Sequence, residues 1–508
     1  MKMKSLLLGV ALAAAISVPA VADSPEVIRM ATSFKIRSMD PIKQGFWMQE
    51  FGQGELLMKF HADGSITPWL AKDLKRVDDT TWVITMRDNI TFQNGKAVDV
   101  PAVLAAIAYN RELNGGTQSV IPAEAEFLQT GPWEITVKTG TPVPELPSIL
   151  AHESRLMIID VDTVKAANGD FEKLEGAGIH TGPFKLISLD DQKMIAERYD
   201  NYWQGKPVMK GVELHFVTDE NARILAVKNG EIDIALYPPV AAKPVFDVTP
   251  GVTLDLGAVS IDGFTGFMNV KKGPMADVAV RKAVMKAVNY QEIADTVFSG
   301  TKGKATGLYN PNFSWALKNY EFDLEEANDL LDKAGWVKKG DYREKDGKPL
   351  SITMLIYPQQ PDLKPLSSAL QGYFKAVGIN SKITSVDSVN ETAKNDLVDW
   401  DFALSSTGTA TVGAVGNFLV RYIHTGGDRN YGYSNANVDQ LIDELNVTMD
   451  QKKRDELLGK IQTVLVEDDP YAFVLALHKE RVLVGDNYTD YVPGVAWNHV
   501  KWDTQPNH

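Results

Sequence analysis

The side chains that could do chemistry in this chain are defined first by what is missing. Cysteine is absent from its 508 residues, whereas histidine occurs eight times. The absence of thiols excludes disulfides, thiolate nucleophiles and thiolate metal sites. The HExxH, G-x-S-x-G and P-loop spacings of metalloproteases, hydrolases and nucleotide-binding enzymes are also absent.

One pair of adjacent acids resembles a catalytic dyad at first sight. Asp468 and Asp469 stand directly before Pro470, at the end of a predicted helix. This position favours a helix cap or a solvated turn over catalysis. The sequence therefore predicts that the chain is not an enzyme, and an exported hydrolase is kept only as a competing hypothesis.

The elements that would position a site alternate between strands and helices, which predicts α/β lobes. Residues Thr81–Arg87 alternate polar and apolar side chains like a half-buried strand, and Val100–Asn110 follows as a helix. Amphipathic helices are predicted over Asp277–Asn289 and Asp323–Ala334, each behind an Asp cap, and over Asp450–Val466. With 44% hydrophobic and 23% charged residues, the composition is that of a globular protein.

The N-terminal segment has the pattern of a secretory signal peptide. Lys2 and Lys4 precede an apolar run from Leu6 to Ile16, and Ala20-Val21-Ala22 forms a small-x-small cleavage site. We expect a signal peptide over residues 1–22, a mature start at Asp23, and a freely soluble protein of the periplasm. Cleavage would remove two lysines and take the net charge from −14 to −16. Such an acidic chain is not expected to bind nucleic acid or an anionic membrane surface.

Several segments together resemble the family 5 solute-binding proteins of ABC transporters, which include dipeptide, oligopeptide and nickel binders. The resemblance covers essentially the whole mature chain and depends on the number, order and spacing of its motifs. These motifs are TWVITMRDNITFQNGKAVDVPAV (81–103), HTGPFKL (180–186), ERYDNYWQGKP (197–207), GEIDIA (230–235), VRKAVMKAVNYQEIADTVFSGTKGKA (280–305), YEFDLEEANDLLDKAGW (320–336), YGYSNANVDQLIDEL (431–445) and KKRDELLGKIQTVLVEDDPY (452–471).

The resemblance implies a two-lobed α/β clamp of the type II, cluster C-like periplasmic binding fold. Mixed sheets flanked by helices would form each lobe, with a hinge between them. Lobe I would span residues 23–264 with a C-terminal return at 481–508, and lobe II would span 265–480. The ligand would lie between the lobes, and the closed form, expected to be a monomer, would dock on a membrane permease.

The nature of the ligand depends on a missing acid in lobe II. Peptide binders of the family usually carry a Trp-x-x-Asp-Tyr-x-Asp-Pro segment whose aspartate binds the peptide ammonium. The corresponding region follows residues 400–406, and no acidic residue occurs from Phe402 to Ile423. A buried ammonium without a carboxylate would be costly. The sequence therefore favours a nickel or other divalent metal chelate, with a dipeptide or oligopeptide as the alternative.

Two histidines are candidate metal ligands. The resemblance to the nickel branch implies a loop histidine shortly after this region, and His424 stands there; a solvated loop histidine is the alternative. His478, on a predicted strand near the lobe crossing, could also reach the cleft; a hydrogen-bonded histidine at a strand end is the alternative. No intrinsic cofactor is expected. A small chelator such as histidine would supply the remaining ligands of Ni(II).

The same resemblance implies an arginine that binds a chelator carboxylate near residues 150–158. Arg155 has the appropriate charge, since guanidinium binds carboxylate bidentately. The best local alignment instead places His152 at the arginine's position, so both residues stay candidates for ligand binding. A surface ion pair is an equal alternative for Arg155.

Aromatic and apolar residues complete the candidate site. Trp47 and Met48 stand where the family's first lobe lines the cleft, although ordinary core positions are an equal alternative. Tyr431 and Tyr433 could donate hydroxyl hydrogen bonds, and Trp497 could close the cleft from the C-terminal return.

Overall fold

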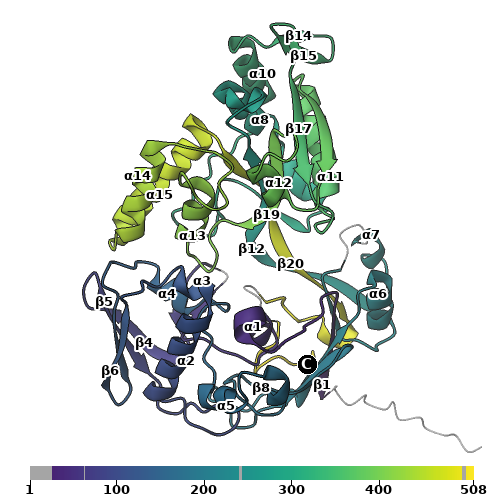
Figure 1. Ribbon diagram of the computed structural model, residues 1–508. Helices are drawn as coiled ribbons and strands as arrows, with labels where there is room; N and C mark the ends of the chain where they lie inside the picture. The colour runs from purple at the N-terminus through teal and green to yellow at the C-terminus, as the bar shows by residue number, and fades with distance from the viewer. Residues whose placement is uncertain (1–25, 62, 239–242, 495–498, 508) are drawn as a thin grey trace, which may run out of the picture.

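The computed structural model describes residues 26–61, 63–238, 243–494 and 499–507. The predicted signal peptide and Trp497 lie outside these residues. The chain folds into two lobes, connected by two long strands that run through the middle of the molecule (Figure 1). We use lobe I for residues 26–264 with 481–507, and lobe II for residues 265–480. No helix in the described part of the chain is long and apolar enough to cross a membrane.

One mixed sheet of 11 strands passes through both lobes, in the order β18-β17-β19-β12-β20-β11-β1-β10-β9-β8, with β13 paired to β20. β1 is parallel to β10 and β11, β17 is parallel to β18 and β19, and the other pairs are antiparallel. Its strands are β1 (Val27–Thr32), β8 (Phe184–Leu189), β9 (Lys193–Arg198), β10 (Gly211–Phe216), β11 (Ile234–Leu236), β12 (Val252–Met268), β13 (Lys302–Lys304), β17 (Ser351–Ile356), β18 (Asn380–Ser385), β19 (Phe402–Gly408) and β20 (Ala472–Gly485).

The crossing between the lobes is formed by β12 and β20, which pair antiparallel along most of their length. Their register shifts between Leu256 and Val259, between Val259 and Gly263, and between Phe264 and Thr265. Such irregularities bend a strand and increase its local twist. The sheet can therefore turn from one lobe into the other at this point, and both of our lobe boundaries fall within these strands.

Lobe I contains a second sheet of four strands in the order β4-β5-β7-β6. Its β5 has the predicted alternation, with every second side chain from Trp82 onward buried. The elements of this lobe outside the large sheet are α1 (Pro41–Glu50), β2 (Met58–Phe60), β3 (Ile66–Pro68), β4 (Ala71–Arg76), β5 (Thr81–Met86), α2 (Val100–Leu113), α3 (Gly115–Gln118), β6 (Glu126–Gly131), β7 (Glu134–Lys138), α4 (Leu146–Leu150), α5 (Val161–Ala166), η1 (Phe171–Leu174), α6 (Glu220–Lys228), α7 (Lys243–Phe246) and η7 (Asp486–Tyr488).

Lobe II packs helices around its half of the large sheet (Figure 1). The predicted caps form: Asp277 accepts the Ala279 amide at 2.9 Å, and Asp323 accepts the Glu326 amide at 2.8 Å. The elements are η3 (Pro274–Ala276), α8 (Val278–Ala287), α9 (Tyr290–Glu292), η4 (Ile293–Val297), α10 (Leu324–Lys333), β14 (Val337–Lys339), β15 (Tyr342–Lys345), β16 (Lys348–Pro349), α11 (Leu363–Ala376), α12 (Val389–Lys394), α13 (Gly416–Phe418), η5 (Leu419–Ile423), α14 (Ala436–Val447), α15 (Gln451–Thr463) and η6 (Val464–Asp468).

The interpretation of Asp469 as a helix cap is confirmed, because it is the C-cap of η6 and its backbone amide donates to the Val464 carbonyl at 2.8 Å. Asp469 also makes a contact that the sequence did not predict. Its carboxylate forms an ion pair with Arg281, whose side chain is only 5% exposed, and accepts the Asn435 amide at 3.1 Å. Arg281 also donates to the carbonyls of Pro470 and Met275. Asp469 therefore neutralises a buried cation between α8 and the start of β20, a long-range contact with no sign in the local sequence.

Candidate functional site

A cavity of about 700 Å³ lies between the two lobes. Lobe I contributes side chains from the segments 115–122 and 141–155, around α3 and α4, and lobe II contributes side chains from the segment 411–428 and Asn446. We call this cavity the inter-lobe pocket. It brings together two of the predicted site residues, His152 and Arg155.

His152 reaches the pocket from the turn that follows α4. Its amide donates to the Ile149 carbonyl and its carbonyl accepts the Arg155 amide, so the turn is held by its own backbone. Nδ1 lies 3.3 Å from the Ser154 amide and 3.6 Å from the Glu153 carboxylate. Nε2 has no hydrogen-bond partner among the described residues. Burial is the main cause that lowers the pKa of His152, so the imidazole is neutral at pH 7.

Arg155 is an unpaired cation in the same wall. Within the described residues its guanidinium forms no ion pair and no side-chain hydrogen bond. Only its backbone is engaged: the amide donates to the His152 carbonyl, and the carbonyl accepts the Thr117 hydroxyl. Burial is the largest effect on the pKa of Arg155 and lowers it; the nearby Glu153 carboxylate partly opposes this, and the charge of Arg421 across the pocket lowers the pKa further. Gly116 allows this placement, because a Cβ there would collide with the guanidinium. The pocket therefore offers a partly desolvated positive charge to a ligand.

The opposite wall belongs to α13, η5 and the loop after them. Arg421 forms two hydrogen bonds with Asp428, at 2.9 and 2.7 Å, and this pairing lowers the pKa of the Asp428 carboxyl. The other carboxylate that lines the pocket, Glu145, accepts hydrogen bonds from the amides of Val415 and Gly416. Both acids in the lining are thus already used by the protein.

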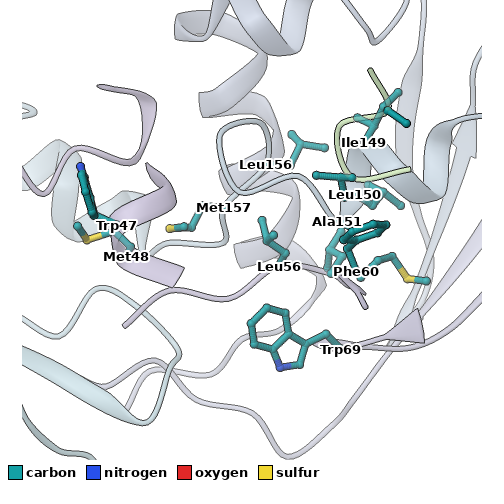
Figure 2. Close-up of a cluster of buried hydrophobic side chains, with 14 of the residues drawn as sticks. Trp47, Met48, Leu56, Phe60, Trp69, Ile149, Leu150, Ala151, Leu156 and Met157 are labelled. Atoms are coloured by element: carbon teal, nitrogen blue, oxygen red, sulfur yellow. The ribbon is translucent and has the colours of Figure 1, made fainter. Parts of the chain in front are cut away.

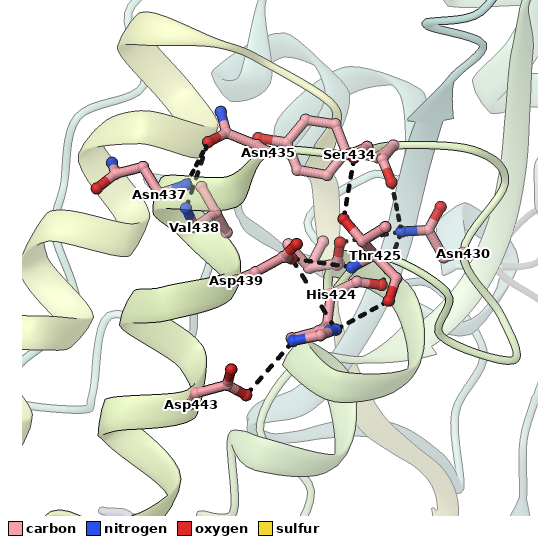
Figure 3. Close-up of polar contacts among 11 residues, drawn as sticks. His424, Thr425, Asn430, Ser434, Asn435, Asn437, Val438, Asp439 and Asp443 are labelled. Atoms are coloured by element: carbon pink, nitrogen blue, oxygen red, sulfur yellow. Dashed lines mark hydrogen bonds and ion pairs between the residues drawn. The ribbon is translucent and has the colours of Figure 1, made fainter.

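His424 stands at the end of η5 and does not line the pocket. Figure 3 shows its ring facing α14, where Nε2 is 3.4 Å from Asp443 and Nδ1 is 4.0 Å from Asp439. Nδ1 also lies 2.9 Å from the Thr425 carbonyl. The side chain is 29% exposed. Its predicted metal role stays a prediction, and in this conformation the role would require the loop to move.

His478 lies on β20 at the lobe crossing, with both ring nitrogens engaged. Nδ1 is 3.0 Å from the Lys302 ammonium and Nε2 is 2.9 Å from the Ser406 hydroxyl. Burial and the Lys302 charge lower the pKa of His478 well below its usual value. Since an ammonium can only donate, Nδ1 accepts and Nε2 carries the proton. Coordination of a metal by His478 would require breaking one of these hydrogen bonds.

The remaining candidates, three aromatic residues and Met48, are each buried within one lobe. Trp47 is 6% exposed and stacks on Phe51, and Met48 is fully buried beside Met157 in the lobe I core (Figure 2). In lobe II, Tyr433 stacks on Tyr471, while Tyr431 packs against Phe267 and Trp400. Their predicted roles at the ligand stay predictions, since none of the four lines the inter-lobe pocket.

Two residues of the pocket lining, Glu145 and Arg421, were not identified in the sequence analysis, nor was Glu153, whose carboxylate lies 3.6 Å from Nδ1 of His152. The partners of Glu145 are 270 or more positions away in the chain, so no local pattern indicates them. Arg421 and Asp428 are seven residues apart, and this spacing alone is too common to predict a site.

Comparisons with known proteins show which proteins this chain is similar to. The chain is 27% identical to the nickel-binding protein NikA of Staphylococcus aureus over 451 residues, 88% of this chain and 87% of that protein. A crystal structure of a nickel ABC transporter protein from Bacillus halodurans aligns with a TM-score of 0.80 and 26% identity, over 94% of this chain and 99% of that one. The structure of Staphylococcus aureus NikA in complex with Ni(L-His)2 aligns with a TM-score of 0.73 and 24% identity, over 95% and 100% of the two chains.

The two-lobed fold predicted from the sequence is confirmed by these structures. The family model of the bacterial extracellular solute-binding proteins, family 5, matches residues 65–430, which is most of the chain. The chain belongs to the family 5 bacterial extracellular solute-binding proteins.

Proposed function

We propose that this chain captures a nickel(II) complex of a small organic chelator, such as histidine, in the inter-lobe pocket. It would deliver this cargo in the periplasm to the permease of an ABC importer, as a monomer without catalytic activity. Relatives that are named as nickel-binding and a structural neighbour bound to Ni(L-His)2 support the proposal. The observation that carries it in this chain is the charge pattern of the pocket.

The pocket pairs a neutral imidazole with a free guanidinium and offers no free carboxylate in its described lining. A chelator carboxylate can bind Arg155 bidentately, and the metal can bind an imidazole. A peptide ammonium would need an anion, but Glu145 and Asp428 are already paired. This balance favours the chelate over the dipeptide or oligopeptide alternative.

Among the histidines, His152 is our proposed metal ligand. Coordination through its free Nε2 would place the ring proton on Nδ1, facing the Glu153 carboxylate at 3.6 Å, and would give up the long bond from the Ser154 amide. A carboxylate behind the second nitrogen is the usual arrangement around metal-binding histidines. His424 is the second candidate, because its loop borders the pocket-lining residues Arg421 and Asp428.

Titration calorimetry with nickel(II) plus L-histidine tests this function, with nickel alone, L-histidine alone and a neutral dipeptide as comparison ligands. We expect tight binding of the nickel–histidine mixture only. His152→Asn should weaken it by roughly tenfold or more, the scale on which metal sites respond to a lost supporting contact, and His424→Ala should leave it unchanged.

Two results would contradict parts of this proposal. Tight binding of the dipeptide, with no binding heat from nickel–histidine, would support the alternative function of a peptide-binding protein. Loss of binding in His424→Ala but not in His152→Asn would keep the cargo and assign the coordination to the loop histidine.

A further inference from the structure

Contacts that join the two lobes gather at one edge of the inter-lobe pocket, around Glu145. This residue immediately precedes α4 in lobe I. Its Oε1 accepts the amides of Val415 and Gly416, both at 3.1 Å, and lies 3.2 Å from Nη2 of Arg454. All three donors belong to lobe II, so one carboxylate oxygen holds two segments of the opposite lobe.

Arg454 is held in place for this contact by its own lobe. Its Nη1 donates to the Leu445 carbonyl at 2.7 Å, at the end of α14, and its side chain is only 9% exposed. Without Glu145 this guanidinium would keep its backbone partners but lose its carboxylate. Because the cation is mostly desolvated, removing its carboxylate partner should cost more than breaking an exposed ion pair would.

The loop that presents the two amides is pressed against lobe I. Gly413 has a φ of +77°, and a Cβ there would lie 3.4 Å from Phe60 and 3.7 Å from Ser148 of lobe I. Val412 beside it has a φ of 51°, a rare conformation for a β-branched residue. This shape carries a conformational cost that the contacts with lobe I must offset. Another hydrogen bond also joins the lobes: Arg76 of lobe I donates to the Met449 carbonyl of lobe II at 2.7 Å.

We propose that Glu145 is a closure latch: its contacts with Val415, Gly416 and Arg454 form when the lobes close over the inter-lobe pocket and break when they open. The chain crosses between the lobes through β12 and β20, in the middle of the molecule (Figure 1). Rotation about that crossing would separate Glu145 from all three donors together. The latch thus stabilises the closed form through contacts between the two lobes, and these contacts do not depend on which ligand the pocket takes.

The latch predicts a change in the open–closed equilibrium on Glu145→Gln. The amide keeps the length of the side chain but removes its charge, which weakens the bonds to the guanidinium and to both amides. Apparent affinity scales with the fraction of protein that can close. We expect a roughly tenfold loss of affinity for nickel–histidine, mostly as faster dissociation, since related complexes differ chiefly in koff.

Fluorescence energy transfer between dyes on the two lobes measures closure directly. The chain contains no cysteine, so Glu112→Cys and Lys452→Cys, both exposed, give two unique labelling positions. We expect Glu145→Gln to reduce the high-transfer population, in the free protein and with nickel(II) plus L-histidine. Asp99→Asn is the matched control, because Asp99 caps α2 entirely within lobe I and should leave the populations unchanged.

The outcomes separate the latch from the cargo. A high-transfer population that depends on Glu145 without any response to nickel–histidine supports the latch and counts against the proposed function. Equal populations in the wild type and Glu145→Gln, or no high-transfer population of the wild type under either condition, would overturn the latch. Arg454→Met provides a second test, and it should reproduce the shift from the other side of the contact.

Discussion

Replacement of Arg155 by methionine gives the most informative test of the pocket, because binding and stability should respond in opposite directions. This guanidinium has no ion pair within the described residues, and burial lowers its pKa. An unpaired, partly desolvated charge does not stabilise a fold. Methionine keeps most of the length of the side chain without the charge.

The magnitude follows from the bonds that a chelator carboxylate would form. Hydrogen bonds to charged groups contribute about 1.5–3 kcal/mol, and each 1.4 kcal/mol is about tenfold in affinity. Arg155→Met should therefore weaken nickel–histidine binding by roughly 10- to 150-fold. The free energy of unfolding without ligand should stay the same or rise by up to about 1 kcal/mol, the lower range of the cost of an unpaired buried polar group.

Calorimetric titration and urea unfolding of the ligand-free protein measure the two effects. Arg421→Met is the matched control on the opposite wall, because that guanidinium is engaged by Asp428. Its pair is largely exposed, so removing it should change affinity by no more than about fivefold. Arg155→Lys keeps the charge but loses the two-pronged geometry, so we expect an intermediate affinity.

Two results would refute this reasoning. Wild-type affinity of Arg155→Met would show that the guanidinium does not bind the cargo. A clear decrease in the free energy of unfolding of the same variant would show that Arg155 stabilises the fold, which contradicts the role of an unpaired charge kept for ligand binding.

Two further predictions concern stability. Burial lowers the pKa of His180 to about 4, below the ordinary value of 6.5, so the unfolded chain takes up the proton first as the pH falls. The contribution of neutral His180 to the free energy of unfolding is therefore complete above pH 6.5, and on the order of 3 kcal/mol of it is lost between pH 6.5 and 4. Urea unfolding at a series of pH values should show this loss in the wild type but not in His180→Leu. Parallel pH dependence of the two proteins would contradict the prediction. Asp469→Ala leaves Arg281 buried without its carboxylate and should lower the free energy of unfolding by about 2–4 kcal/mol, whereas a change below about 1 kcal/mol would show that the pair acts like an exposed one.

The sequence alone determined the features that depend on neighbouring residues. The caps Asp277 and Asp323 lie within three residues of the amides they bind, so their role can be predicted from local chemistry. The alternation in β5 reflects the geometry of a single strand in the same way. The family and its two-lobed fold also followed from motifs spread along the chain, which the family model and the related structures confirm.

The composition of the pocket was decided only by the tertiary structure. The sequence placed both His152 and His424 in loops from which a side chain could reach a ligand. In the structure the turn after α4 directs His152 into the pocket, whereas the ring of His424 faces the carboxylates of Asp439 and Asp443 on α14. Trp47 is buried because α1 packs into lobe I, which a short amphipathic segment does not reveal. Glu145 and Arg454 are 309 residues apart, and their contact exists only because β12 and β20 bring the two lobes together. Long-range pairs of this kind depend on how whole elements pack, and local sequence patterns carry no record of that packing.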